Sequence, residues 1–328
     1  MNKSTCLALM LLVLWSEQSA TAKMIVFDPA GSTYTMPMAI NSKGWIAGFY
    51  NDNNFKKNSP GFVRAPNGTI TPFDVKGDKI ATFALAINDN GTVAGEYKDR
   101  SVISHGFVRT ADGAITTFDV PKSSQTEPQS MNDSGVITGF YHDISDIEHG
   151  FVRTTNGSIT AFDPEGSTQT VPSSINKTGT IVGTYTENQS GHGFIRTADG
   201  TITTFDPPGA EGTVVFSINS KGAIVGEYFA SGTKHGFLRS PQGTITTIDP
   251  PGSIQTFPFG IDDKGVITGS FFSDLPHGFV RAADGAYTTF DPKNSVDTNP
   301  NDINKKGAIT GFWQKENPGP LHGFLRTP

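Results

Sequence analysis

Histidine and aspartate recur in this sequence in an order that suggests metal binding or proton transfer. Six histidines precede a Gly-Phe step: His105, His149, His192, His235, His277 and His322. Aspartates that follow Phe or Ile include Asp28, Asp119, Asp163, Asp206, Asp249 and Asp291. Imidazole and carboxylate groups bind transition metals and act as acids and bases. A residue repeated in every copy of a motif does the same task in each copy. We therefore predict structural His–Asp hydrogen bonds that hold no metal.

Two glutamates offer the other pair of groups for acid–base chemistry. Glu96 and Glu227 take the same place in two copies of the repeat, where the other copies have Phe, Thr or Ser. We expect both on strands set back from the centre of the molecule, too far apart to act as a catalytic pair. The sequence motifs of serine hydrolases, zinc proteases and P-loop enzymes are absent. We predict no catalytic residue and no cofactor.

The chain is built from repeats, and three independent markers agree on seven copies. The Phe-Asp or Ile-Asp step recurs at intervals that fall from 46 to 42 residues. An arginine closes each "GF[VIL]R" step, at Arg64, Arg109, Arg153, Arg196, Arg239, Arg281 and Arg326. A glycine closes each "N-x-x-G" or related step, at Gly44, Gly91, Gly135, Gly179, Gly222, Gly265 and Gly307. Periods of this length indicate a propeller or a solenoid.

Each copy reads as four short strands, as in 201–206, 213–219, 223–228 and 235–239. These segments are rich in Ile, Val, Thr, Phe and Tyr, which suit a pleated sheet, and none shows a helical period. We predict an all-β fold, a seven-bladed β-propeller of four-stranded antiparallel blades. The first strand, 24–28, should complete the last blade beside 322–326 and close the ring. The single domain then spans 23–328.

The turns carry their own signatures. Asn-Gly and Asp-Gly pairs such as Asp199-Gly200 predict two-residue type I′ hairpins. That register places Phe194 opposite Phe205 within one hairpin, and by the same rule Phe27 opposite Phe324. The "N-x-x-G" step predicts a type I turn whose glycine is left-handed.

The first 22 residues read as a secretory signal peptide. Lys3 precedes a ten-residue apolar run, and "ATA" at 20–22 is a small-residue cleavage site. We expect an exported protein, secreted to the exterior or held in the periplasm. The single cysteine, Cys6, lies inside this segment. The net charge of −6 argues against nucleic-acid and anionic-membrane partners.

These motifs resemble those of the extracellular HAF-repeat family, over nearly all of 24–328. The family has a His-Ala-Phe step followed by a turn glycine, a hydrophobic strand and an "IN-x-x-G" step. Here the step is His-Gly-Phe, and Arg follows where the family often has Trp. The resemblance implies export and a β-repeat architecture, and it implies no particular activity.

Function is expected where the repeat varies. Two positions on the innermost strand differ strongly between copies, and from them we select Glu127, Gln129, Asn299, Asn301, Phe257 and Phe259 as candidate ligand-binding residues. The long connections 51–60, 98–104, 142–148 and 314–320 share one face, and loops on a rigid scaffold are common binding sites.

The sequence therefore predicts a secreted, monomeric and non-catalytic propeller that binds a glycan or an extracellular protein. Two alternatives remain open. One is a polysaccharide lyase or hydrolase that acts from the same face, and the other is a surface or matrix structural protein.

Overall fold

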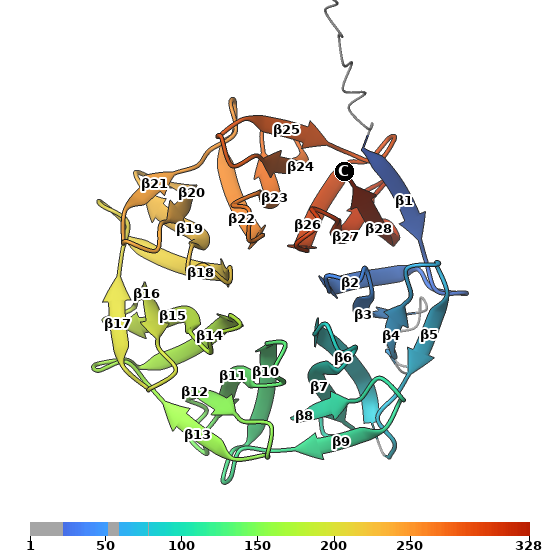
Figure 1. The fold of residues 1–328 in the computed structure, drawn as a ribbon, viewed down its shortest axis with the longest axis vertical. Coiled ribbons are helices and arrows are strands. Elements are labelled where there is room, and N and C mark those ends of the chain that lie inside the picture. The colour runs from blue at the N-terminus through green and yellow to red at the C-terminus, as the bar shows by residue number, and fades with distance from the viewer. Residues whose placement is uncertain (1–21, 52–58, 78) are drawn as a thin grey trace, which may run out of the picture.

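The computed structural model describes residues 22–51, 59–77 and 79–328, and these residues form strands and turns without a helix. The sheets are arranged around a common centre, with one strand of each repeat innermost (Figure 1). The predicted signal peptide, apart from Ala22, and most of the predicted loop 51–60 lie outside the described residues.

Every repeat contributes one strand to each of four positions, counted outward from the centre. The innermost strands are β2 (Tyr34–Ile40), β6 (Lys79–Ile87), β10 (Gln125–Met131), β14 (Gln169–Ile175), β18 (Gly212–Ile218), β22 (Gln255–Ile261) and β26 (Asp297–Ile303). The second strands are β3 (Ile46–Asn51), β7 (Val93–Asp99), β11 (Ile137–His142), β15 (Ile181–Glu187), β19 (Ile224–Ala230), β23 (Ile267–Phe272) and β27 (Ile309–Gln314).

The third strands are β4 (Gly61–Arg64), β8 (Ser104–Arg109), β12 (Glu148–Arg153), β16 (Ser190–Arg196), β20 (Thr233–Arg239), β24 (Pro276–Arg281) and β28 (Leu321–Thr327). The outermost are β5 (Ile70–Phe73), β9 (Ile115–Phe118), β13 (Ile159–Phe162), β17 (Ile202–Phe205), β21 (Ile245–Thr247), β25 (Tyr287–Phe290) and β1 (Lys23–Phe27). We call β2–β5 unit 1 and number the units along the chain to unit 7, which is β26–β28 with β1.

Units 2 to 6 are separate four-stranded antiparallel sheets, whereas units 1 and 7 belong to one eight-stranded sheet. A single parallel residue pair, Tyr34 with Leu321, joins these two units. Strand β1 pairs with β28 along its whole length, from Lys23 opposite Thr327 to Phe27 opposite Gly323. The first and last strands of the fold therefore meet, as the sequence predicts. Each innermost strand also contacts the next, and β26 contacts β2.

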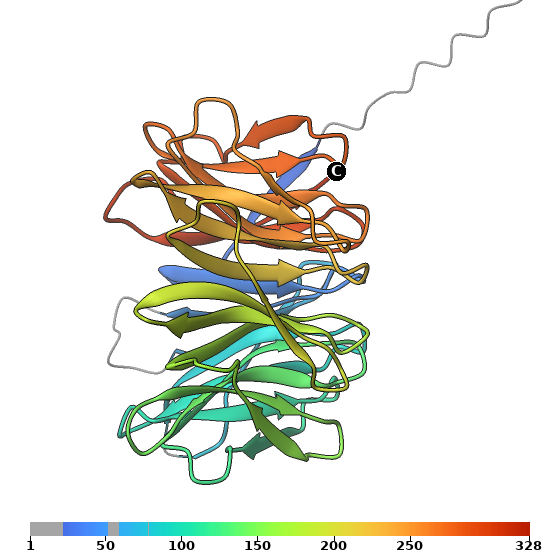
Figure 2. The ribbon, with the colours of Figure 1, turned by 90° about the vertical axis from the view of Figure 1, so that its left-hand side faces the viewer.

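The strands run from one face of the disc to the other, so the connections gather on two faces (Figure 2). One face holds the links from outermost to next innermost strand and from second to third strand. We call it the loop face. The opposite face holds the two kinds of tight turn, and we call it the turn face.

The hairpin from third to outermost strand differs from the prediction. Phe205 lies opposite Gly193, and Phe194 lies opposite Thr204, one residue away from the expected register. The turn is closed by Gly200 N donating to Thr197 O and Thr197 N to Thr201 O, and only Gly200 has positive φ. This is a type I turn with a glycine bulge, not type I′. Phe27 likewise lies opposite Gly323 instead of Phe324.

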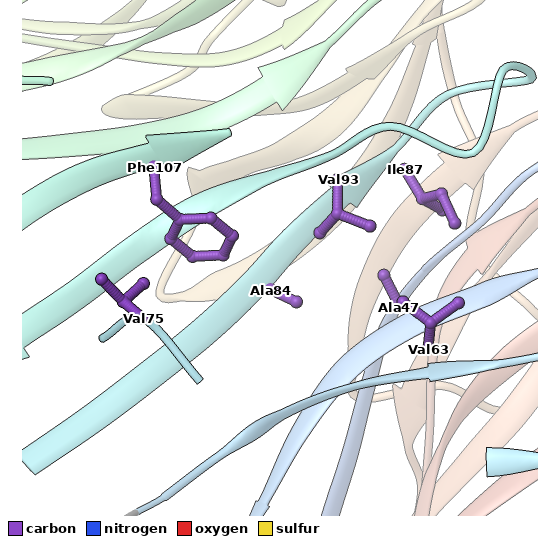
Figure 3. Packing of buried hydrophobic residues seen from close by; sticks show 7 residues of the cluster. All are labelled: Ala47, Val63, Val75, Ala84, Ile87, Val93 and Phe107. Carbon is purple, nitrogen blue, oxygen red and sulfur yellow. The ribbon is translucent and has the colours of Figure 1, made fainter. Parts of the chain in front are cut away.

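The changed register places the two phenylalanines of a hairpin on opposite sides of their sheet, because a one-residue shift reverses the facing. Phe205 covers Gly193, where an added Cβ would lie 2.8 Å from its ring, and reaches Phe237 of the next unit with ring centroids 6.0 Å apart. Phe194 is fully buried and meets Phe162 of the preceding unit at 5.9 Å. The repeated aromatics therefore join neighbouring units. Figure 3 shows one such interface, where Ala47 and Val63 of unit 1 pack against residues of unit 2 around Phe107.

The repeated arginines extend this link between units. The Arg64 guanidinium carbon lies 4.7 Å from the ring centroid of Phe27, and Arg109 lies 4.9 Å from that of Phe73. The same contact recurs for Arg153, Arg196, Arg239 and Arg326, each on the outermost phenylalanine of the preceding unit. Cation–π attraction contributes about 0.5–2 kcal/mol per pair. The arginines also bind backbone oxygen, as Arg64 Nη1 does in donating to Ala65 O at 3.3 Å.

A ring of asparagine side chains joins the innermost strands at the turn face. Asn41 Oδ1 accepts hydrogen bonds from Lys43 N and Trp45 N of its own turn, which is the predicted "N-x-x-G" turn. Its Nδ2 donates to Asn88 O of the next unit at 2.9 Å. Equivalent bonds of 2.8–3.4 Å are donated by Asn88, Asn132, Asn176, Asn219 and Asn304.

This ring is interrupted at Asp262, which stands where the other units have asparagine. Its Oδ1 accepts from Lys264 N and Val266 N as asparagine would. Its Oδ2 is buried and finds no hydrogen-bond partner among the described residues, since a carboxylate cannot donate to the next carbonyl.

Asp262→Asn should therefore stabilise the protein, because the new amide can donate to Asn304 O. A buried hydrogen bond contributes about 1 kcal/mol, and we expect the melting temperature to rise by about 2–4 °C. Asp284→Asn is the matched control, because the Asp284 and Asn156 side chains accept the same turn bond. An unchanged or lower melting temperature for Asp262→Asn would contradict the interpretation.

Deletion of 23–30 should destabilise the whole domain. It removes β1, the Phe27–Phe62 contact at 6.2 Å and the hydrogen bond between His322 and Asp28. Burial of one Phe contributes about 1.5–3 kcal/mol. We expect a single denaturant transition at lower concentration than for the full chain, with Phe27→Ala intermediate. A deletion variant with the same midpoint would show that this strand matters little.

Candidate functional site

The six predicted His–Asp hydrogen bonds are present. His Nδ1 lies 2.7–3.0 Å from a carboxylate oxygen in the pairs with Asp119, Asp163, Asp206, Asp249, Asp291 and Asp28. The rings also lie against an aromatic of the second strand, and His105 stacks on Tyr97 with centroids 5.0 Å apart. Asp206 accepts a further bond from Thr213 of the next innermost strand. The purely structural role of these pairs stays a prediction. No group of three or more His, Asp or Glu among the described residues is arranged to hold a metal.

The candidate residues lie on the innermost strands as expected. They are half-buried, and they occupy two positions along each strand. Glu127, Phe257 and Asn299 pair across to the second strand. Gln129, Phe259 and Asn301 occupy a β-bulge that recurs in every innermost strand. Bulge residues of neighbouring units meet one another: the Phe216 and Phe259 centroids are 5.1 Å apart, and Asn301 Nδ2 donates to Pro37 O.

Not all six candidates come together. Asn299 Nδ2 donates to Asp297 Oδ1 and the Asn301 amide to Pro37 O, so both amides have partners within the protein. Phe257 and Phe259 belong to one cluster in units 5 and 6, and Glu127 belongs to another in units 2 and 3.

Four phenylalanines of units 5 and 6 form an aromatic cluster. Phe257 is 6.2 Å from Phe259 and 5.8 Å from Phe272, and Phe259 also contacts Phe216. The Lys234 ammonium lies 5.2 Å from the Phe257 centroid and 2.7 Å from Glu227 Oε1. Burial raises the pKa of Glu227, and the Lys234 hydrogen bond and charge oppose that rise.

Two carboxyl groups approach each other between units 2 and 3, and the sequence did not predict this pair. Glu96 is only 8% exposed, and its carboxyl lies near Glu127 of the next unit. Burial raises the pKa of Glu96 to about 7, the Glu127 charge adds to the rise, and Lys98 and Ser104 oppose it. Burial also raises the pKa of Glu127, while His142 and Lys98 lower it. Glu96 and Glu227 thus have separate neighbours, Glu127 of unit 3 and Lys234 of unit 5.

The turn face is more than a set of turns, because a cavity of about 220 Å³ lies at its centre. Five asparagines of the ring line this cavity, together with Asp302, Lys177 and Lys305. Lys305 of unit 7 reaches Asp89 of unit 2 and Asp133 of unit 3, each at 3.4 Å. Asp302 accepts from Ile40 N and Ile303 N, and burial raises its pKa to about 7. The sequence contains a signal for this residue, because Asp302 stands where the other repeats have Ala, Ser or Gly.

No family model matches the chain, and no curated protein matches its sequence. Solved structures do match. A catalytically inactive virginiamycin B lyase from Staphylococcus aureus with quinupristin has a TM-score of 0.64 at 15% identity, over 94% of this chain and 99% of that one. The β-propeller domain of the Trilobed protease from Pyrococcus furiosus has a TM-score of 0.62 at 12% identity, over 90% and 94%. The fold is a β-propeller.

A third similar structure is YCF48 bound to D1 peptide, with a TM-score of 0.56 at 11% identity, over 93% of this chain and 96% of that one. At such low identities these likenesses concern the propeller fold alone. No helix of the described residues is long and apolar enough to cross a membrane.

The raised pKa of Asp302 predicts a pH-dependent stability. Below about pH 4 Asp302 is protonated in both the folded and the unfolded chain. Between pH 4 and 7 only the unfolded chain has released the proton, so the free energy of unfolding falls as pH rises, by at most about 1.4 kcal/mol per pH unit. Above about pH 7 the contribution is constant.

Asp302→Ser should flatten this profile. The serine hydroxyl can still accept from Ile40 N, as Ser130 does from Ile175 N. Denaturant titrations of both proteins at pH 4 to 8 measure the difference, and the contributions of Glu96 and the other carboxyls cancel in it. Parallel profiles would mean that Asp302 titrates normally.

Proposed function

We propose that this chain is an exported seven-bladed β-propeller that binds a protein partner through its loop face and catalyses no reaction. The blade count follows from treating each unit as one blade. Units 1 and 7 share a sheet only through the Tyr34–Leu321 pair, whereas each is held internally by extended antiparallel ladders. The β1–β28 pairing and the contact of β26 with β2 support a closed ring.

The observation that carries the binding function is the position of the exposed apolar side chains. Among the described residues, the large apolar side chains that are exposed lie at the loop face, apart from Val26 and Trp45. They are Ile80, Val102, Ile103, Ile144 and Ile147 over units 2 and 3, and Val214, Phe229, Ile254, Phe272 and Leu275 over units 5 and 6. Ile144 is 90% exposed and Ile254 is 61% exposed.

Apolar groups gathered on one face indicate an interaction site. Aliphatic side chains such as Ile144 and Ile254 favour a protein partner, because sugar rings are bound mainly by aromatic and hydrogen-bonding groups. The aromatic cluster around Phe257 supports a glycan as the alternative ligand of the same face.

One observation favours a second candidate function, cleavage of a polysaccharide. The Glu96–Glu127 pair contains one carboxyl whose pKa is raised to about 7 and a second carboxyl beside it, which is the arrangement of a general acid and its partner. Polysaccharide cleavage that is present in the full chain and lost in Glu96→Gln would establish this candidate and contradict a non-catalytic role.

The binding function is tested on protein and glycan arrays with the double variant Ile144→Ser, Ile254→Ser. We expect the ligands of the full chain to lose at least about tenfold in affinity, because each exposed apolar contact contributes about 1 kcal/mol or more at an interface. Trp45→Ala on the turn face is the matched control and should bind normally. The double variant should melt like the full chain, since Ile144 and Ile254 are largely exposed. Weaker binding by the control alone would place the ligand on the turn face.

A further inference from the structure

Glu96 and Glu227 occupy the same structural position in units 2 and 5. Each lies on the second strand, opposite an innermost-strand residue of its own unit, Phe83 and Val214 respectively. Each side chain is buried near the innermost strand of the next unit, Glu96 by Glu127 and Glu227 by Phe257. We call the space around each glutamate its carboxyl slot.

In unit 5 the chain fills this slot with its own ammonium group. Lys234 extends from the third strand and places Nζ 2.7 Å from Glu227 Oε1, beside the Phe257 ring. The Lys234 side chain remains 42% exposed. A cation on a partly exposed aliphatic stem therefore reaches the buried Glu227 carboxyl group, and it gains an ion pair and a cation–π contact there.

In unit 2 the same slot lacks the ammonium group. Ser104 stands where unit 5 has Lys234, because each directly precedes the repeated histidine and pairs with the second strand. Glu96 Oε2 and Ser104 Oγ are buried and have no hydrogen-bond partner among the described residues. The Ser104 hydroxyl lies near both carboxyl groups without the geometry of a hydrogen bond to either.

The charges around the unit 2 slot favour a cation. Glu127 on β10 adds a second carboxyl group where unit 6 has Phe257. Lys98 on β7 is the nearby cation, and its charge lowers the pKa of both glutamates. No ion pair within 4.0 Å joins it to either carboxyl group among the described residues, and its ammonium lies 6.0 Å from the Phe83 centroid. His142 on β11 lies 3.9 Å from Glu127 and 3.8 Å from Glu148 of β12. Burial without a paired cation also explains why the pKa of Glu96 is raised to about 7.

We propose that the carboxyl slot between units 2 and 3 binds the ammonium group of a lysine side chain from a partner protein, at the place that Lys234 fills between units 5 and 6. This inference rests on the proposed loop-face function. A lysine is favoured over an amino sugar for two reasons. The chain itself uses a lysine in the matching slot, and the exposed Val102, Ile103, Ile144 and Ile147 belong to the loops of the same two units.

The first experiment titrates the full chain with Nα-acetyl-lysine amide and follows binding by NMR. Nα-acetyl-norleucine amide is the neutral control, and glucosamine represents an amino sugar. We expect one saturable lysine site at pH 8, at least tenfold weaker at pH 5 because Glu96, whose pKa is raised to about 7, takes up a proton. The norleucine derivative should not bind. Absence of lysine binding at pH 8, or binding of glucosamine alone, would overturn the proposal.

Exchanging the residues between the two slots tests the assignment. Ser104→Lys supplies an internal ammonium group and should abolish the lysine site. Lys234→Ser empties the unit 5 slot and should give two sites per chain. The double variant Ser104→Lys, Lys98→Phe copies the Lys234–Phe229 pair of unit 5, and it covers the case in which two adjacent lysines disturb folding. Lysine binding that is unchanged in Ser104→Lys and in the double variant would overturn the proposal.

The proposed function and the slot can fail separately. If the loop-face variant Ile144→Ser, Ile254→Ser loses an array ligand that Ser104→Lys binds normally, the ligand binds at the loop face. The proposal that the carboxyl slot binds a lysine of that partner is then contradicted. If both variants lose the same protein ligand while Trp45→Ala retains it, both proposals are supported.

Discussion

The architecture depends on one small interaction, made by the side-chain amide of the asparagine that follows the innermost strand in every unit except unit 6. Its oxygen closes the turn within its own unit, and its nitrogen binds the backbone of the next unit. A four-stranded sheet needs the first bond, and only an assembly of sheets needs the second. A single side chain therefore serves both the local turn and the ring. The outer aromatics and arginines then fasten the units at a larger radius.

The sequence predicted the elements well because their signals are local and repeated. The strand order, the left-handed turn glycine, and the pairing of His322 with Asp28 all follow from the spacing of the motifs. The hairpin register was wrong because Asp-Gly is compatible with two turns that differ by one residue. Phe205 therefore contacts Phe237 of the next unit and not Phe194 of its own. The aromatic contact therefore stabilises the packing of one unit on the next instead of the hairpin itself.

The candidate site could be predicted only in part, because it depends on contacts between units. Phe257 and Phe259 were found from variation on one strand, and they do belong to one cluster. The proximity of Glu96 and Glu127 combines a second strand of one unit with an innermost strand of the next. No repeat pattern carries that information. Lys234 and Ser104 gave no signal either, since a single substitution before a repeated histidine has meaning only beside the buried glutamate it faces.

The pairing of β1 with β28 also has a temporal consequence. The hydrogen bond between Asp28 and His322 joins residues 294 positions apart, almost the full length of the chain. A ribosome adds about 5–20 residues per second, so roughly 15–60 s separate the synthesis of the two partners. Throughout that interval strand β1 has no strand to pair with, and its backbone groups stay available to any other strand edge. The last strand to be made is thus the one that ends the exposure of the first.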